Sequence, residues 1–142
     1  MSKKYNKILI VDDEEDLSWS ISKSLKRNNE MIDVTCVNRG DEASKLLKSR
    51  SFDLVISDIR MPGKSGLELL DEIRTNNSNT SVILMTAYGS QEIENKLRTI
   101  NNVKYIEKPF DIHDLKRMVF GNDMSDEKIS PVIPDSVYMG IR

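Results

Sequence analysis

The stretch that decides the fold is FDLVISDIRMPGKSGLELL, which runs from Phe52 to Leu70. It opens with a nearly continuous apolar run, passes through a loop with a Pro-Gly pair, and closes with leucines at helical spacing. Such a run is typical of a strand that is covered on both faces, as in a parallel sheet. The stretch therefore predicts a strand, a loop and a helix, which is the repeating unit of an α/β fold.

Similar units account for most of the chain. Five Val- and Ile-rich runs are predicted strands, namely Lys7–Val11, Met31–Val37, Phe52–Ser57, Ser81–Met85 and Val103–Ile106. The run Met31–Val37 alternates apolar and polar residues, so we expect it at an edge of the sheet. Segments with apolar residues at three- and four-residue spacing follow each run and predict amphipathic helices. This order predicts an α/β fold, with a doubly wound parallel sheet covered by helices on both faces.

Residue types that favour helix ends support these boundaries. Ser65, Ser90 and Asp111 are predicted to begin the third, fourth and last helices, and Gly121 is predicted to end the last one.

Residues 1–121 are expected to form one domain, because 142 residues suit a single core of ordinary size. Residues 122–142 carry two prolines, a charged cluster and no helical period. We therefore expect a tail or a linker stub there, without an output domain. A short partner-binding strip in this segment is the alternative.

Composition narrows the class of protein. The chain is 38% hydrophobic and 31% charged, which is typical of a folded soluble domain. The net charge of −2 argues against direct binding of nucleic acid, and no apolar run approaches the roughly 20 residues of a membrane span. A single cysteine, Cys36, excludes a disulfide framework within one chain. The N-terminus does not resemble a secretory signal, so we expect a cytoplasmic protein without membrane insertion.

Polar residues follow four of the five predicted strands. Asp12 and Asp13 come directly after the first strand and Asp58 after the third. Thr86 follows the fourth strand, and Lys108 comes two residues after the fifth. Because the carboxyl ends of parallel strands meet at one edge of the sheet, we predict that these side chains share a pocket. Each of them alone is an ordinary cap or turn residue, and only their joint placement indicates a site.

Three carboxylates in one pocket repel one another, by about 4 kcal/mol for a pair at about 4 Å and an effective dielectric near 20. A hard divalent cation relieves this repulsion, and Mg²⁺ suits an oxygen-only site best. Lys108 can then hold a phosphoryl group by its charge and Thr86 by a hydrogen bond. An aspartate beside a metal and a lysine suits the role of nucleophile, which indicates an aspartyl phosphate.

Four motifs resemble the receiver domains of two-component response regulators. They are ILIVDDEED at residues 8–16, VISDIRMPGKSGLELL at 55–70, ILMTAYGS at 83–90 and KYIEKPF at 104–110. The resemblance covers about residues 5–121. It implies a flavodoxin-like (βα)5 fold with the strand order 2-1-3-4-5.

The resemblance also implies roles for the acidic residues and their neighbours. Asp58 would be the phosphoryl acceptor. Asp13 would bind Mg²⁺ directly, and Asp12 would assist through a water molecule. Asp58 and the backbone carbonyl of Arg60 would complete the protein ligands.

A conformational switch is implied as well. Lys108 would pair with the phosphoryl group, and its bond to Pro109 would be cis. Thr86 would move toward a phosphoryl oxygen, and Tyr105, the switch aromatic, would turn inward behind it. That movement would alter the face formed by the fourth helix, the fifth strand and the fifth helix. Without the resemblance, Tyr105 is interpreted more simply as a half-exposed strand tyrosine.

Further hypotheses concern the roles of three bulky side chains, those of Arg60, Tyr88 and Trp19. Arg60 and Tyr88 stand two residues after Asp58 and Thr86, where they would slow the attack of water on a phosphoryl group. Trp19 lies two positions off the apolar stripe of the first helix, so we expect it to be partly exposed. It would either pack under residues of the C-terminal tail or contact a phosphodonor protein.

The resemblance implies a signalling module of a phosphorelay rather than an enzyme. It would accept its phosphoryl group from a sensor histidine kinase or a histidine phosphotransfer protein and would act on a downstream protein target. Its catalysis would be limited to its own phosphorylation and dephosphorylation. A phosphorylation-dependent homodimer is a further possible assembly.

Two other functions are alternatives to this one. An aspartate-nucleophile phosphatase would carry an Asp-x-Asp motif, whereas Glu14 and Arg60 stand two residues after Asp12 and Asp58. A receiver-like scaffold that binds without phosphorylation would usually have lost an acidic or lysine position, and this chain keeps them all.

Overall fold

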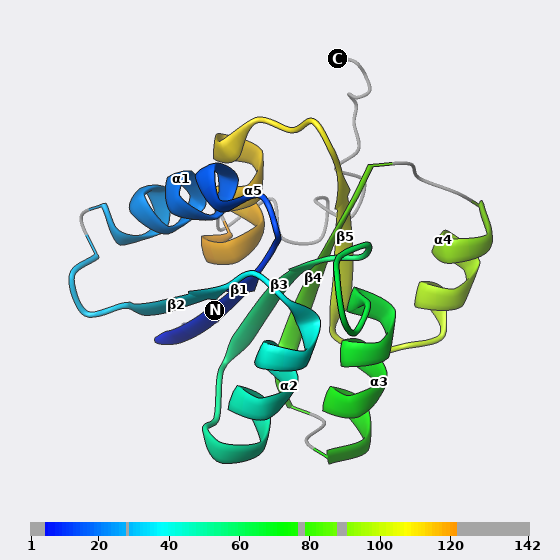
Figure 1. Ribbon diagram of the computed structural model, residues 1–142. Coiled ribbons are helices and arrows are strands. Elements are labelled where there is room, and N and C mark those ends of the chain that lie inside the picture. The colour runs from blue at the N-terminus through cyan, green and yellow to red at the C-terminus, as the bar shows by residue number, and fades with distance from the viewer. Residues whose placement is uncertain (1–4, 28, 77–78, 88–90, 122–142) are drawn as a thin grey trace.

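The computed structural model of the chain describes residues 5–27, 29–76, 79–87 and 91–121. In these ranges five strands alternate strictly with five helices (Figure 1). The strands are β1 (Lys7–Val11), β2 (Asp33–Val37), β3 (Leu54–Asp58), β4 (Ser81–Thr86) and β5 (Val103–Glu107). The helices are α1 (Glu15–Lys26), α2 (Gly40–Ser49), α3 (Gly66–Asn76), α4 (Gln91–Arg98) and α5 (Ile112–Phe120). Tyr88, Ser90 and residues 122–142 lie outside the described residues, so the predictions for them stay predictions.

All five strands are parallel and pair in the order β2-β1-β3-β4-β5, as the resemblance implied. The register places Ile10 of β1 between Cys36 of β2 and Ile56 of β3. Strand order reverses between β1 and β3, and their carboxyl ends lie at the same edge of the sheet. Such a switch point is where sheets of this kind bind ligands.

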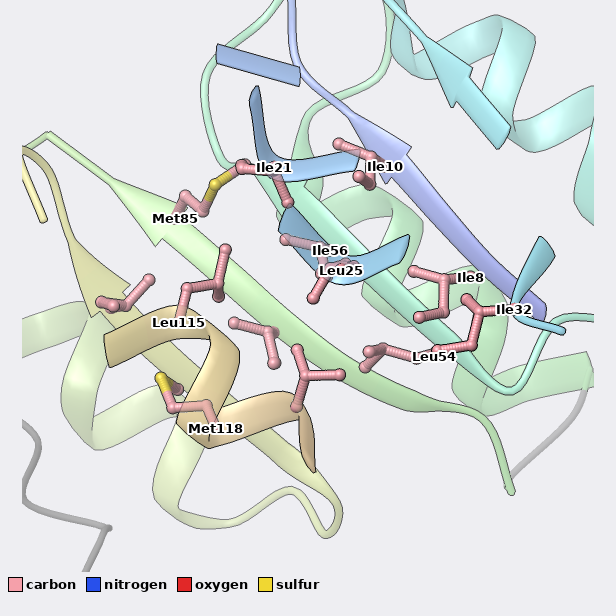
Figure 2. Packing of buried hydrophobic residues seen from close by; sticks show 13 residues of the cluster. Ile8, Ile10, Ile21, Leu25, Ile32, Leu54, Ile56, Met85, Leu115 and Met118 are labelled. Carbon is pink, nitrogen blue, oxygen red and sulfur yellow. The ribbon is translucent and has the colours of Figure 1, made fainter. Parts of the chain in front are cut away.

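Successive residues of the inner strands point to opposite faces of the sheet and build two hydrophobic clusters. One cluster includes Ile8 and Ile10 and packs against α1 and α5 (Figures 1 and 2). The other includes Leu9 and Val11 and packs against α2, α3 and α4. Every residue of β3 and β4 is buried, which explains why these runs are nearly continuously apolar rather than alternating.

The strand β2 lies at an edge of the sheet, as its alternating sequence predicted. It begins at Asp33 rather than at the predicted Met31. The reason is a turn in which the Ile32 N–H donates to the Asn29 carbonyl at 3.2 Å, and this turn leaves Met31 88% exposed. Cys36, on the apolar side of the alternation, is exposed as well. The edge strand is therefore covered less completely than the inner strands.

The helix ends predicted at Ser65, Asp111 and Gly121 are confirmed. Ser65 and Glu68 form a capping box, in which the Glu68 N–H donates to Ser65 Oγ at 3.1 Å and the Ser65 N–H donates to Glu68 Oε1 at 2.9 Å. The Asp111 carboxylate accepts the His113 N–H at 2.9 Å. Gly121, with φ of 72°, ends α5. Among the described residues, no helix is long and apolar enough to span a membrane.

Candidate functional site

The strand ends bring the predicted polar side chains together at one edge of the sheet. Asp12 follows β1, and its N–H extends the hydrogen bonding to β2. Asp58 is the last residue of β3. Lys108 follows β5, and its N–H donates to the Thr86 carbonyl of β4 at 2.7 Å. The peptide bond between Lys108 and Pro109 is cis, as the resemblance implied.

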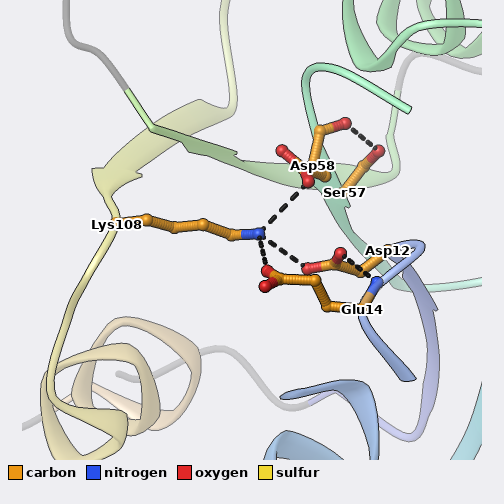
Figure 3. A network of polar contacts seen from close by, with 5 residues as sticks. All are labelled: Asp12, Glu14, Ser57, Asp58 and Lys108. Atoms are coloured by element: carbon orange, nitrogen blue, oxygen red, sulfur yellow. Dashed lines mark hydrogen bonds and ion pairs between the residues drawn. The ribbon is translucent and has the colours of Figure 1, made fainter. Parts of the chain in front are cut away.

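The ammonium group of Lys108 occupies the centre of this pocket (Figure 3). It lies 3.0 Å from Asp12 Oδ2 and 3.1 Å from Asp58 Oδ2. A third carboxylate, that of Glu14, accepts from the same nitrogen at 2.8 Å. One lysine thus joins the ends of β1, β3 and β5.

Burial and charge shift the pKa values of the two innermost groups. Asp12 is completely buried, and this burial raises the pKa of its carboxyl although the Glu14 N–H and Lys108 both donate to it. Burial alone would lower the pKa of Lys108. Its hydrogen bonds to Glu14, Asp12 and Asp58 outweigh that effect and raise the pKa above its ordinary range. Lys108 is therefore a fixed positive charge at neutral pH.

The carboxylates of Asp12, Asp13 and Asp58 form a candidate metal site. Each can offer one oxygen such that the three oxygens lie within 4.8 Å of one another. Asp12 and Asp58 are buried, whereas Asp13 is exposed and open to solvent. With Glu14 included, the pocket gathers four carboxylates, and three of them, those of Asp12, Glu14 and Asp58, contact the ammonium of Lys108. An oxygen-only donor set with this excess of negative charge suits a hard divalent cation such as Mg²⁺.

The loop after β3 is held close to the end of its strand. The Ile59 N–H donates to the Met85 carbonyl of β4, and the Gly66 N–H donates to the Ile59 carbonyl, both at 2.9 Å. A Cβ atom on Gly66 would lie 2.4 Å from the carbonyl oxygen of Asp58, so only glycine allows this approach. Arg60 lies within this loop with an exposed side chain. The backbone that carries the Arg60 carbonyl is therefore anchored at both ends.

Thr86 and Tyr105 lie on the same face of the sheet. Thr86 is buried at the end of β4, two residues after Leu84, and Leu84 pairs with Tyr105 of β5. Tyr105 is half-buried and packs with the cluster beneath α2, α3 and α4. Burial, together with the negative charge of the nearby Glu94 carboxylate of α4, raises the pKa of Tyr105 to about 12. In this conformation Tyr105 of β5 belongs to the same cluster as Ile93 and Leu97 of α4.

Glu14 is the residue of the pocket that sequence reasoning missed. In the sequence Glu14 stands out only as a departure from an Asp-x-Asp motif. The sequence places Glu14 two residues after Asp12 at the start of a helix, on the edge where the strand ends converge, but it does not show whether the side chain faces water or the lysine. A carboxylate at that place lies within reach of the lysine.

Trp19 lies beside the pocket rather than in it. Its side chain is 62% exposed, as its position off the helix stripe predicted, and the Lys23 ammonium lies 4.7 Å from its ring centroid. Together with Asp12, Glu15 and Cys36, Trp19 lines an open cleft between α1 and β2. Changes at the pocket are therefore expected to reach the environment of the indole ring.

Fold and pocket together define a class: a doubly wound α/β domain with an acidic pocket, crossed by a lysine, at the switch point of its sheet. Residues 8–120 match the family described as the response regulator receiver domain. The chain belongs to this family, whose members act in two-component signal transduction and generally bind Mg²⁺ at such an acidic pocket.

Curated relatives of two kinds resemble the chain. The regulatory protein AtoC of Escherichia coli is 36% identical over 114 residues, which are 80% of this chain and 24% of AtoC. The sporulation initiation phosphotransferase F of Bacillus subtilis is 30% identical over 113 residues, which are 80% of this chain and 90% of that protein. The chain thus spans about a quarter of the length of relatives such as AtoC.

Solved receiver domains have the same fold. The receiver domain of the Francisella response regulator 1452 superposes with a TM-score of 0.72 at 32% identity, covering 80% of this chain and 93% of that one. The response regulator TrrA of Thermotoga maritima, solved in complex with Mg²⁺ and BeF, has a TM-score of 0.69 at 34% identity. That match covers 80% of this chain and 96% of TrrA.

Proposed function

We propose that the domain accepts a phosphoryl group on Asp58 from the phosphohistidine of a sensor histidine kinase or a histidine phosphotransfer protein. The observation that carries this proposal is the Asp58 carboxylate, which lies 3.1 Å from the Lys108 ammonium and beside the acidic pair. An Asp58 oxygen would attack phosphorus and the phosphorus–nitrogen bond would break. The imidazole would keep the electron pair and take up one proton.

Mg²⁺ is the proposed cofactor, held by Asp12, Asp13, Asp58 and the backbone carbonyl of Arg60. When bound, it would supply positive charge that offsets the carboxylates and the incoming phosphoryl oxygens. Asp13 is exposed and suits a direct ligand. Both oxygens of Asp12 already accept hydrogen bonds, from the Glu14 N–H at 2.9 Å and from Lys108 at 3.0 Å, which favours a role through water.

The proposed switch consists of Thr86 and Tyr105. Phosphorylation replaces the single negative charge of the Asp58 carboxylate with the roughly two negative charges of a phosphoryl group, and it adds three acceptor oxygens next to the end of β4. Thr86 would donate its hydroxyl to one of these oxygens, and Tyr105 would turn inward on the same face of the sheet. That movement would change how Tyr105 packs beside Ile93 and Leu97 of α4, so α4 and the face formed by α4, β5 and α5 would change together.

This face is the proposed docking surface for a downstream protein target, and a phosphorylation-dependent homodimer would use it as well. The proposal assigns protein contacts, not direct nucleic-acid binding, to these residues. Catalysis would be limited to phosphorylation and dephosphorylation of Asp58. Arg60, two residues after Asp58, and Tyr88, two residues after Thr86, would slow the second reaction by restricting water.

Intact mass spectrometry tests the proposal. The chain is incubated with acetyl phosphate, with and without Mg²⁺, beside the variant Asp58→Asn. We expect one added phosphoryl group on the unaltered chain with Mg²⁺, and none without Mg²⁺ or in the variant. Beryllofluoride binding covers the case in which rapid hydrolysis hides the adduct. Absence of both the adduct and beryllofluoride binding would contradict the proposal and favour a scaffold that binds without phosphorylation.

The decay of the isolated phosphoprotein tests the role of the bulky residues. The phosphoryl group on Arg60→Ala is expected to be hydrolysed faster than that on the unaltered chain, because a smaller side chain admits water to the phosphorus. An unchanged or slower decay in Arg60→Ala would show that Arg60 does not shield the phosphoryl group.

A further inference from the structure

The ammonium of Lys108 has all three of its hydrogens engaged before any phosphoryl group arrives. A lysine ammonium has three donors and no acceptor. Its nitrogen contacts Glu14 at 2.8 Å, Asp12 at 3.0 Å and Asp58 at 3.1 Å, and each partner is a carboxylate (Figure 3). If Lys108 is to hold a phosphoryl oxygen, it must release one of these three.

The three partners differ in how easily they can be released. The side chain of Asp12 has no exposed surface, and that of Asp58 is only 11% exposed. Breaking the Asp12 contact would leave a fully buried carboxylate without its ammonium partner, which is costly. Asp58 stays beside Lys108 in either state, because it carries the phosphoryl group itself. The Glu14 side chain is 63% exposed, so water can solvate its carboxylate as soon as Lys108 leaves it. Glu14 is therefore the partner that gives way.

We infer that Glu14 is a positioning residue that competes with the phosphoryl group for Lys108. In the unphosphorylated domain Glu14 holds the Lys108 ammonium close to Asp12 and Asp58. On phosphorylation, a phosphoryl oxygen replaces the Glu14 carboxylate as a partner of Lys108. No covalent bond to Glu14 forms or breaks. This inference rests on the proposed phosphorylation of Asp58, and it adds a residue whose contact opposes the phosphorylated state.

The contact between Glu14 and Lys108 is therefore expected to weaken the binding of an anion at the pocket by a measurable amount. An exposed ion pair of this kind changes an equilibrium by about 1.4- to 5-fold. The variant Glu14→Gln is expected to bind beryllofluoride in excess Mg²⁺ about two- to fivefold more tightly than the unaltered chain. The fluorescence of Trp19, the chain's single tryptophan, reports binding because the ring lines the cleft beside Asp12.

Two matched variants separate the Lys108 contact from a general effect of charge. Glu15→Gln removes the same charge one residue later, from a side chain that hydrogen-bonds Asn38 at 2.9 Å instead of Lys108. Glu14→Asp keeps the charge but is one methylene shorter, so its contact with Lys108 is weakened. We expect Glu14→Asp to bind beryllofluoride more tightly than the unaltered chain, and Glu15→Gln to match the unaltered chain.

The outcomes are distinct. If Glu15→Gln raises the affinity as much as Glu14→Gln, or if Glu14→Asp behaves as the unaltered chain, long-range charge and not the contact is responsible and the inference is wrong. Equal affinity in Glu14→Gln and the unaltered chain also overturns it, while the proposed function stands. Failure of the unaltered chain to bind beryllofluoride and to form an adduct overturns the proposed function itself. A parallel Mg²⁺ titration is expected to show no tighter metal binding in Glu14→Gln.

Discussion

Gly40 and Lys64 approach so closely that a Cβ atom on Gly40 would lie 1.8 Å from the carbonyl oxygen of Lys64. Gly40 is the first residue of α2, and Lys64 belongs to the loop that follows Asp58. The Gly40 N–H donates to the Pro62 carbonyl of the same loop at 3.2 Å. Helix α2 is thus attached directly to the loop that carries the Arg60 carbonyl, one of the proposed metal ligands.

The variant Gly40→Ala is expected to lose stability. Alanine in place of glycine usually stabilises a helix by about 1 kcal/mol, but here the added methyl group meets a backbone carbonyl that cannot move away cheaply. We expect the free energy of unfolding to fall by about 1–3 kcal/mol in urea titrations. Lys45→Ala, at an exposed position of α2, is the control and should change it by less than about 0.5 kcal/mol. A Gly40→Ala protein as stable as this control would contradict the close approach.

A polar cluster between α2, α3 and the same loop provides a second prediction. Lys64 forms an ion pair with Glu72 of α3, and the buried Ser44 hydroxyl donates to Glu72 Oε1 at 2.8 Å. A double-mutant cycle with Lys64→Met and Glu72→Gln is expected to give a coupling energy of about 1–2 kcal/mol, because the pair is partly buried and hydrogen-bonded.

The matched control for this cycle is the ion pair of Arg50 and Asp33, at 3.9 Å and with both side chains more than 40% exposed. Its coupling energy should stay below about 0.5 kcal/mol. Equal coupling in the two cycles would mean that the Lys64–Glu72 pair adds nothing beyond an ordinary surface contact.

The variant Asp12→Asn is expected to be more stable than the unaltered chain in the absence of Mg²⁺. Burial raises the pKa of Asp12 above its ordinary value of 3.8, so the folded state binds the proton more tightly than the unfolded chain does. The contribution of Asp12 to stability therefore falls as the pH rises from 3.8 through the folded-state pKa, and at neutral pH the ionised carboxyl destabilises the fold. Removing its charge relieves that effect.

Thermal unfolding with and without Mg²⁺ checks this prediction. Mg²⁺ should raise the unfolding temperature of the unaltered chain, and Asp12→Asn should show a smaller rise. Asp16→Asn is the control, since this exposed carboxylate lies in the first turn of α1, where it favours the helix. A loss of stability in metal-free Asp12→Asn would show that the Lys108 contact outweighs the cost of burial.

Tyr105 predicts an alkaline dependence of stability. Its pKa of about 12 in the folded state lies above its ordinary value of 10.0, so the unfolded chain loses this proton first. Between these two pH values the folded state binds more protons, and the contribution of Tyr105 to stability is lost as the pH rises through that window. In Tyr105→Phe this part of the alkaline loss should be absent.

An ultraviolet difference titration of the unaltered chain against Tyr105→Phe isolates the phenolate of Tyr105. Its midpoint is expected near 12, and Glu94→Gln should move it toward 10, because the neighbouring carboxylate contributes to the shift. A midpoint near 10 in the unaltered chain would mean that Tyr105 is solvated and already free of α4.

The alternation of elements and the positions of the strand ends could be predicted from the sequence because both depend on local signals. Near-continuous apolar runs mark strands that are buried on both faces, and these runs end at Asp58 and Thr86, within one residue of the predicted boundaries. Parallel strands align their carboxyl ends, so Asp12 and Lys108 could be brought together without coordinates. The strand order itself came from family resemblance, not from periodicity.

The tertiary structure alone decided which side chains meet once the elements are packed. Glu14 contacts Lys108 across 94 positions of sequence, and Lys64 contacts both Ser44 of α2 and Glu72 of α3 where its loop packs against the start of α2. An exposed acidic residue at a helix start looks the same in sequence whether it faces water or a lysine. Its partner is set by the spacing of neighbouring strands and helices, and that spacing results from the packing of the whole sheet, not from any single stretch of the chain.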